Sequence, residues 1–123
     1  MNDALITFLP AADLDRASRF YGDTLGLELV VDQGMCRIYR VATSGFIGLC
    51  QRDEATIDTE GVIVTIVRDD VDEFCARLVA KGVTLEQPPN QNEQFGIYQA
   101  FLRDPDGNLV EVQRFDDPDW AGA

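Results

Sequence analysis

The sequence predicts an α+β fold made of two tandem βαβββ modules, because the chain repeats itself at three separate places. In each copy a short aliphatic strand leads to an aspartate and a helix, and three further strand-like runs follow. An offset of 57 residues aligns 13–17 with 70–74 and 5–9 with 62–66, and an offset of 62 aligns 45–52 with 107–114. The second copy therefore has a few extra residues, which we expect in the polar stretch 87–93.

Local signals place the elements of each copy. Asp13 and Asp70 are expected to N-cap the two helices, since an aspartate side chain accepts hydrogen bonds from free backbone N–H groups. Gly26 and Gly82 stand where a left-handed residue usually ends a helix, and 104–108 (DPDGN) predicts a tight hairpin turn. The expected strands are 4–9, 27–32, 35–42 and 45–51 in the first copy and 61–67, 83–86, 96–103 and 107–114 in the second. The modules span about 1–52 and 61–115, with a linker at 53–60 and a tail at 116–123, all within one domain of residues 1–123.

The composition indicates a soluble globular protein. The chain has 123 residues, 46% of them hydrophobic, and no apolar run long enough to cross a membrane. Its net charge of −12 repels phosphate backbones and anionic lipids, so we expect no nucleic-acid or membrane partner. The same charge would attract a cationic small molecule, although it also serves solubility alone. The first residues lack the basic and apolar regions of a signal peptide, which predicts a cytoplasmic protein.

The cysteine pattern predicts reduced, mostly buried thiols. Cys36, Cys50 and Cys75 are an odd number with wide spacing and no Cys-x-x-Cys motif, which argues against a disulfide framework or a zinc site. A catalytic thiol needs a basic partner such as histidine, and the chain contains no histidine. We therefore expect none of the three to be a nucleophile.

Two motifs resemble a known family. Residues 14–21 (LDRASRFY), followed by 25–27 (LGL), look like the first helix and turn of the vicinal oxygen chelate superfamily, which includes glyoxalases, bleomycin-resistance proteins and extradiol dioxygenases. Residues 101–111 (FLRDPDGNLVE) look like its closing hairpin. The resemblance implies a curved mixed sheet around a cleft, with the helices outside, and a homodimer. It does not fix an activity, because one fold supports many functions.

The resemblance also implies four metal positions, on the first and last strands of each module. Counted from the motifs and the repeat, they fall at Ile6, Leu49, Ile63 and Glu111. Three are aliphatic and have no lone pair to offer, whereas a catalytic divalent ion needs about three protein ligands. We therefore predict no metal and no other cofactor at the family position, while an all-oxygen magnesium or calcium site elsewhere stays open.

Glu111 has two interpretations. Strand alternation puts it on the face opposite Val110 and Val112, so it would point into the cleft. There it would orient a ligand or act as a general base, or it would be a residual carboxylate satisfied by arginine or water. Tyr39 and Phe101, paired by the repeat, would line the cavity or pack against the helices.

The leading hypothesis is a metal-free small-molecule-binding protein, closest in character to the bleomycin-resistance branch. It would hold a cationic antibiotic or similar ligand in a dimer cleft, with aromatic rings stacking on the guest. The alternatives are a lyase or dioxygenase-type enzyme that uses Glu111 and a dimeric regulatory module without a small ligand. Trp120 would cap the cleft or seal the edge of the core. The predicted ligand-binding residues are Phe8, Tyr39, Leu49, Ile63, Phe101 and Glu111.

Overall fold

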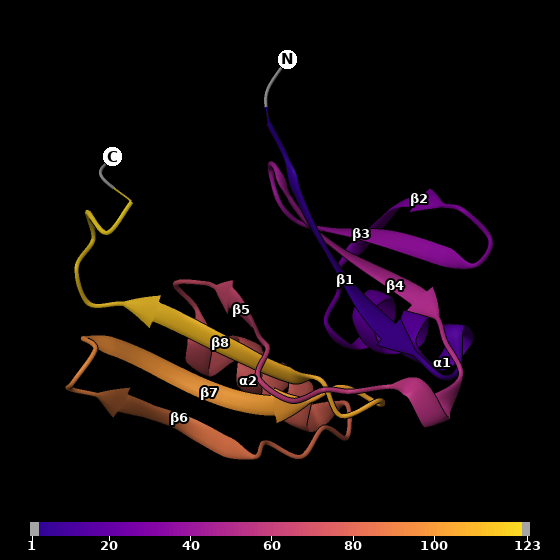
Figure 1. The fold of residues 1–123 in the computed structure, drawn as a ribbon. Helices are drawn as coiled ribbons and strands as arrows, with labels where there is room; N and C mark the ends of the chain where they lie inside the picture. Colours follow the sequence, from indigo (N-terminus) through magenta and orange to yellow (C-terminus); the bar gives the residue numbers. More distant parts are fainter. Residues whose placement is uncertain (1–2, 122–123) are drawn as a thin grey trace. The chain divides into compact units, whose positions relative to one another are not determined.

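A computed structural model describes residues 3–121 and divides the chain into two compact units. The first unit runs to Glu60 and also includes Asp104–Asn108. The second begins at Gly61, is interrupted by that segment and resumes at Leu109. Each unit contains a helix between the first two strands of a four-stranded mixed sheet, in βαβββ order (Figure 1). The predicted α+β fold of two tandem βαβββ modules is confirmed.

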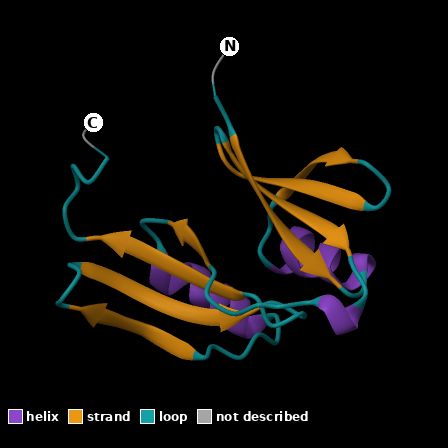
Figure 2. Cartoon of the chain, in the orientation of Figure 1, coloured by secondary structure: helices purple, strands orange, loops and turns teal. Residues whose placement is uncertain are grey.

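In the first unit the strand order is β1-β4-β3-β2. β1 pairs with β4 in parallel, and the other neighbours are antiparallel. The helix α1 continues into a short π-helix, η1, and both lie on one face of the sheet (Figure 2). The elements are β1 (Leu5–Ala11), α1 (Leu14–Arg19), η1 (Phe20–Thr24), β2 (Glu28–Asp32), β3 (Cys36–Ala42) and β4 (Gly45–Gln51), followed by a 3-10 turn, η2 (Glu54–Thr56).

The second unit repeats this order as β5-β8-β7-β6, with α2 on one face of the sheet. Its elements are β5 (Ile63–Val67), α2 (Val71–Ala80), β6 (Gln87–Asn92), β7 (Ile97–Arg103) and β8 (Leu109–Phe115). The apolar side chains of α2 and the strand residues beneath it form a core from which water is excluded, the main source of folding free energy. These buried residues are Val71, Phe74, Cys75 and Leu78 of α2 and Ala100, Leu102, Val110 and Val112 of the sheet. Within residues 3–121, no helix combines the length and the apolarity needed to span a bilayer.

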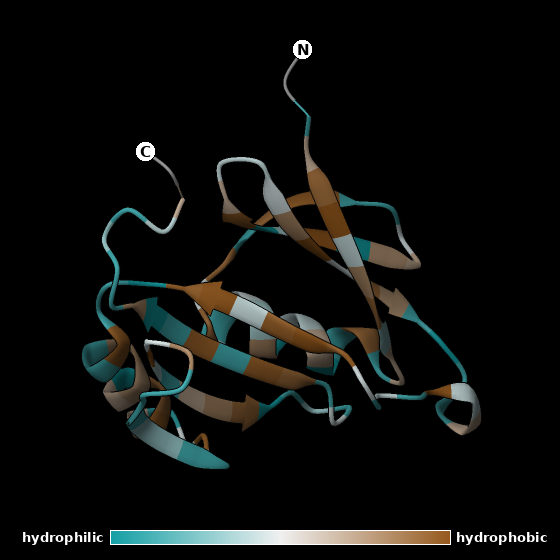
Figure 3. Cartoon of the chain, turned by 60° about the vertical axis from the view of Figure 1, so that its left-hand side comes forward, coloured by the Kyte–Doolittle hydropathy of each residue, from teal (hydrophilic) through white to brown (hydrophobic). Residues whose placement is uncertain are grey.

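The prediction of a strand at 83–86 is wrong. β6 instead occupies Gln87–Asn92, the polar stretch that we had assigned to an insertion, and it appears hydrophilic in Figure 3. Pro88 and Pro89 obscured it, because proline has no N–H to donate and is poorly compatible with an interior strand. β6 is an edge strand, and its pairing with β7 shifts between Gln87 and Asn90, so the prolines lie where a missing donor costs least.

Both helices begin at the predicted aspartates, but the two aspartates act differently. The side chain of Asp13 accepts a hydrogen bond from the backbone N–H of Arg16 at 3.1 Å, as an N-cap should. Asp70 makes no such bond and instead accepts from Arg68 at 2.7 and 2.9 Å. Arg77 also donates to it, at 3.4 Å. The hydrogen bond from Arg68 lowers the pKa of the Asp70 carboxyl from its ordinary 3.8 to about 2. The predicted left-handed glycines are confirmed at Gly26 and Gly82.

The turn between β7 and β8 is built around the Asp104 carboxylate. Asp104 is buried and accepts hydrogen bonds from the hydroxyl of Tyr21 at 2.8 Å and from the side-chain amide of Asn108 at 2.8 Å. It also accepts from the backbone N–H groups of Asp106 and Asn108, both at 2.9 Å. Burial, followed by the charge of Asp104, raises the pKa of Tyr21 well above its ordinary value, so the hydroxyl stays protonated and donates. The turn motif therefore has a structural role within the first unit.

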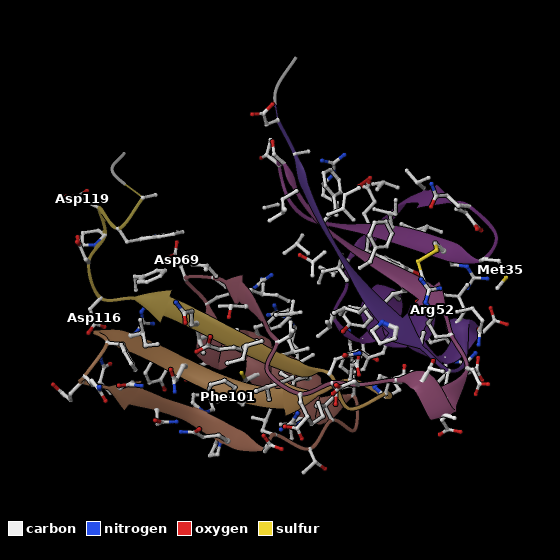
Figure 4. The ribbon with its side chains drawn as sticks, viewed as in Figure 1. Met35, Arg52, Asp69, Phe101, Asp116 and Asp119 are labelled. Carbon is white, nitrogen blue, oxygen red and sulfur yellow. A yellow bond between two sulfur atoms is a disulfide. The ribbon has the colours of Figure 1, made fainter. Side chains whose placement is uncertain are left out.

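The cysteine prediction is wrong for two of the three thiols. Cys36 and Cys50 face each other on the antiparallel strands β3 and β4 and form a disulfide (Figure 4). Their Cα atoms are 4.2 Å apart, close to the spacing of a non-hydrogen-bonded antiparallel pair. The register shifts between Arg40 and Ala42, and without this irregularity Cys36 would face Gln51 instead. Cys75 is a buried free thiol of α2, as predicted.

Candidate functional site

Each sheet has one side covered by helix and one helix-free face. In the first sheet the covered side is identified by Tyr39 and Arg37, which reach Ser18 of α1 with hydrogen bonds of 3.4 and 2.9 Å. In the second sheet it is identified by Tyr98, which donates to Asp72 of α2 at 2.6 Å. Because side chains alternate along a strand, the opposite parity defines the helix-free face. Its residues are Ile6, Phe8, Pro10, Cys36, Ile38, Arg40, Phe46, Gly48 and Cys50 in the first unit, and Ile63, Thr65, Val67, Gln99, Phe101, Arg103, Leu109, Glu111 and Gln113 in the second.

The strand register corrects the repeat offset on the last strands. Leu9 pairs with Leu49 in the first unit, and its counterpart Ile66 pairs with Val112 in the second. The offset between β4 and β8 is therefore 63 rather than 62, and the counterpart of Glu111 is Gly48. Leu49 is fully buried on the helix-covered side.

The helix-free face of the first unit is apolar at its centre. Phe8 pairs with Gly48, and its ring lies directly over that glycine: an added Cβ would come within 2.4 Å of Cδ1 of Phe8. The glycine thus provides the space that the phenylalanine occupies. Phe8 remains 51% exposed, so the ring also offers surface to solvent. Ile6 lies on the same face, two residues away, and is likewise exposed.

The helix-free face of the second unit carries a buried carboxylate. Glu111 is 8% exposed, and its Oε1 accepts a hydrogen bond of 2.7 Å from the hydroxyl of Thr65, its partner on β5. With its side-chain amide nitrogen turned toward the carboxylate, Gln113 donates to Oε1 at 3.1 Å and to Oε2 at 3.0 Å. Gln99 lies opposite Gln113 on β7 and is also buried. Both donors to Glu111 are neutral, and within residues 3–121 no arginine or lysine forms an ion pair with it.

The predicted site residues separate into two groups. Phe101 of β7 pairs directly with Glu111 of β8. It lies on the helix-free face and is half-buried (Figure 4). Ile63 also lies on that face and is exposed. Tyr39 and Leu49 do not lie on that kind of face. The expected orientation toward a cavity is wrong for Leu49, which lies in the core, and Tyr39 packs against Gly22 of η1, which is the second of the two orientations left open by the sequence. The structural counterpart of Tyr39 is Leu102, so the expected pairing of Tyr39 with Phe101 also fails.

Trp120 stacks on Phe115 at the end of β8. The ring centroids are 4.3 Å apart and the planes differ by 18°, and the indole remains 52% exposed. Phe115 has the same parity on β8 as Gln113 and Glu111, so the stacked pair extends the helix-free face of the second unit. Trp120 therefore does not seal the core.

The four metal positions implied by the resemblance do not form a donor set. Ile6 and Ile63 are aliphatic, and Leu49 points into the core. Gly48, which the strand register makes the counterpart of Glu111, has no side chain. Within residues 3–121 no group of three or more His, Cys, Asp or Glu side chains is arranged to hold a metal ion. One carboxylate falls short of the three or more protein ligands that such ions generally need.

Three further residues of the second unit were missed by sequence reasoning: Thr65, Gln99 and Gln113. Period-two alternation places all three on the same face as Ile63, Phe101 and Glu111, so parity was the available signal. Gln113 lies on the same strand as Glu111, whereas Thr65 and Gln99 lie on other strands, and which strands are neighbours is not visible in the sequence.

Two βαβββ units in tandem, each with a helix on one face of its sheet and the other face free of helix, define a class of proteins built from a duplicated module. The sequence matches the Glyoxalase/Bleomycin resistance protein/Dioxygenase superfamily over residues 5–112, and the chain belongs to this family.

Relatives of the chain differ in what their names say. A lactoylglutathione lyase from Agrobacterium tumefaciens is 27% identical, with a TM-score of 0.74 and coverage of 93% of this chain and 94% of that one. TioX from Micromonospora sp. ML1 is 24% identical, with a TM-score of 0.76 and coverage of 92% and 98%. The uncharacterized protein YraH of Bacillus subtilis strain 168 is 24% identical over 83% of this chain and 90% of its own length.

Proposed function

We propose that this chain binds a cationic small molecule on the helix-free face of its second unit, without a metal ion at the family position. The observation that carries the proposal is the buried Glu111 carboxylate, whose donors Thr65 and Gln113 are both neutral. Burying a carboxylate costs free energy unless it is well paired. A cationic group of a ligand would supply the missing charge, so ligand binding relieves a cost already present in the free protein.

The surroundings of Glu111 support such a guest. Phe101 lies directly beside it and offers an aromatic surface, and the Phe115–Trp120 stack extends the same face. Binding sites for small molecules commonly combine apolar and aromatic surface with a few polar groups that fix the orientation. The net charge of −12 favours the approach of a cation.

The test is a titration with a basic glycopeptide, bleomycin, followed by calorimetry and by the fluorescence of Trp120, the single tryptophan of the chain. We expect saturable binding that weakens about tenfold to one-hundredfold in Glu111→Gln, because the variant loses a charge-assisted hydrogen bond. The control is Glu73, an exposed residue of α2. Glu73→Gln makes the same charge change away from this face, and the variant should bind like the unmodified chain. Equal affinity in both variants would refute the role of Glu111, and absence of binding would favour a module without this ligand class.

A second candidate is an enzyme that uses Glu111 as a proton-transfer base, which the 27% identity to a lactoylglutathione lyase favours. An assay of lactoylglutathione formation, before and after treatment with a chelator, separates the two. Activity that chelation abolishes and a divalent ion restores would overturn the metal-free proposal. Activity that survives chelation and is lost in Glu111→Gln would replace binding with catalysis.

We also propose that two chains associate in solution, as the family resemblance implies. Sedimentation equilibrium of the full chain measures this directly. A mass equal to one chain at all concentrations would contradict it.

A further inference from the structure

We propose that Cys36 and Cys50 form a reversible thiol–disulfide couple whose site of attack by low-molecular-weight thiols is Cys36. The couple is independent of the ligand proposed above. Two structural facts support it: the strand register holds the two sulfur atoms together, and the two cysteines differ in accessibility.

The sheet brings the two thiols together in either redox state. Cys50 lies on β4, which is held between β1 and β3, and Cys36 is directly opposite on β3. The backbone hydrogen bond from Gln51 to Met35, 2.9 Å long, continues the β3–β4 pairing just beyond the two cysteines. Because this pairing does not depend on the sulfur–sulfur bond, the reduced cysteines stay within reach of each other and the bond can form again.

Accessibility decides which sulfur is attacked. Cys36 is the first residue of β3, follows the exposed turn residues Gln33–Met35 and is itself only half-buried. Cys50 is 5% exposed and lies in the interior of the sheet. Thiol–disulfide exchange requires the incoming thiolate to reach a sulfur atom along the line of the breaking bond. Cys36 is the more exposed residue of the pair, so an incoming thiolate should reach its sulfur first.

The exchange balances in two steps. A low-molecular-weight thiolate attacks Sγ of Cys36, the Cys36–Cys50 bond breaks, and Cys50 leaves as a thiolate that takes up a proton. A second thiolate then attacks the small-molecule sulfur of the mixed disulfide, which releases Cys36 as a thiolate. In total, two small thiols are oxidised to one small disulfide and the protein disulfide is reduced to two thiols. A low-molecular-weight disulfide drives the same steps backward.

The experiment uses the full chain with glutathione as the probe. The oxidised protein is exposed briefly to reduced glutathione, quenched with acid and mapped by mass spectrometry of its peptides. We expect the mixed disulfide on Cys36, and a fully oxidised protein with one free thiol, Cys75. Three free thiols after equilibration with oxidised glutathione, or glutathione found on Cys50, would overturn the proposal.

Matched single-cysteine proteins test the accessibility argument separately. In a Cys75→Ser background, Cys50→Ser leaves only Cys36 and Cys36→Ser leaves only Cys50. We expect Cys36 to react with oxidised glutathione about tenfold faster or more, since thiol reactivity follows exposure as well as pKa. Equal rates in two variants of unchanged circular dichroism would refute the assignment, and the trapping experiment needs no variant if either fails to fold.

Discussion

The two units share one topology, yet their helix-free faces have different chemistry. At three equivalent pairs of facing positions on the last two strands, the first unit has a disulfide, an isoleucine beside a glycine, and an arginine over a phenylalanine. The second has two glutamines, a phenylalanine beside Glu111, and an arginine beside a leucine. On the last strand of each unit the helix-covered side carries buried aliphatic residues, Ile47 and Leu49 in the first unit and Val110 and Val112 in the second. Packing against the helix therefore constrains one side of each sheet, whereas the residues of the other side can differ between the units and acquire a function.

The largest test of this comparison concerns the disulfide of the first unit, whose place in the second unit is taken by Gln99 and Gln113. The bond closes a loop with a sequence separation of 14 residues. Constraining a loop of this length in the unfolded chain stabilises a protein by about 3 kcal/mol. We expect the Cys36→Ser/Cys50→Ser variant to lose that amount in urea denaturation.

The control is Cys75→Ser, which should be as sensitive to a reducing agent as the unmodified chain. Unmodified protein that unfolds at the same urea concentration with and without reductant would contradict the prediction. The disulfide would then make no measurable contribution to stability at the positions that Gln99 and Gln113 occupy in the second unit.

An intermediate effect is expected at Gly48, the counterpart of Glu111. In Gly48→Ala the new methyl group would lie 2.4 Å from Cδ1 and 3.2 Å from Cγ of Phe8, so the ring must move off the sheet. Overpacking of this kind costs about 2 kcal/mol. Thermal or urea denaturation measures the loss. In the double variant Phe8→Ala/Gly48→Ala most of this cost should be absent when the variant is compared with Phe8→Ala alone, because the ring is no longer there. A Gly48→Ala protein as stable as the unmodified chain would show that the ring does not need the glycine.

The smallest effect separates the two aspartates that precede the helices, Asp13 and Asp70. Asp70 has its pKa lowered to about 2 by Arg68, so its stabilising contribution is complete above the ordinary value of 3.8 and is lost as the pH falls through about 2. Its side chain is 39% exposed, so we expect Asp70→Asn to cost at most about 1 kcal/mol at neutral pH.

The stability difference between Asp70→Asn and the unmodified chain should shrink below pH 4 and disappear near pH 2. Asp13→Asn is the matched variant at the other helix, where asparagine also caps well, and should change little at either pH. A difference for Asp70→Asn that is constant down to pH 2 would show that its charge is not responsible.

Much of the fold followed from the sequence because its signals are local. The repeat, the two aspartates before the helices and the glycines after them predicted the element order, and the structure confirms it. Parity along a single strand also predicted that Glu111 points to the face opposite Val110 and Val112, and the strand register places it on the helix-free face.

The errors came from register, which depends on neighbouring strands. Aligning Gly45 with Gly107 gave an offset of 62 instead of 63. The two glycines are not counterparts, because Gly107 has a positive φ of +90° in a turn, whereas Gly45 is the first residue of β4. A slip of one residue exchanges the two faces of a strand, and this misplaced Leu49 and Tyr39. The disulfide was missed for a related reason: only the irregularity near Val41 brings Cys36 opposite Cys50.

The two prolines of β6 affect more than the assignment of that strand. An edge strand with its full set of backbone donors can template the addition of a foreign strand, which is a common route to aggregation. Pro88 and Pro89 remove two donors in succession from this border of the second sheet. The protein thus protects one border of its second sheet against strand addition by using residues that cannot complete a ladder.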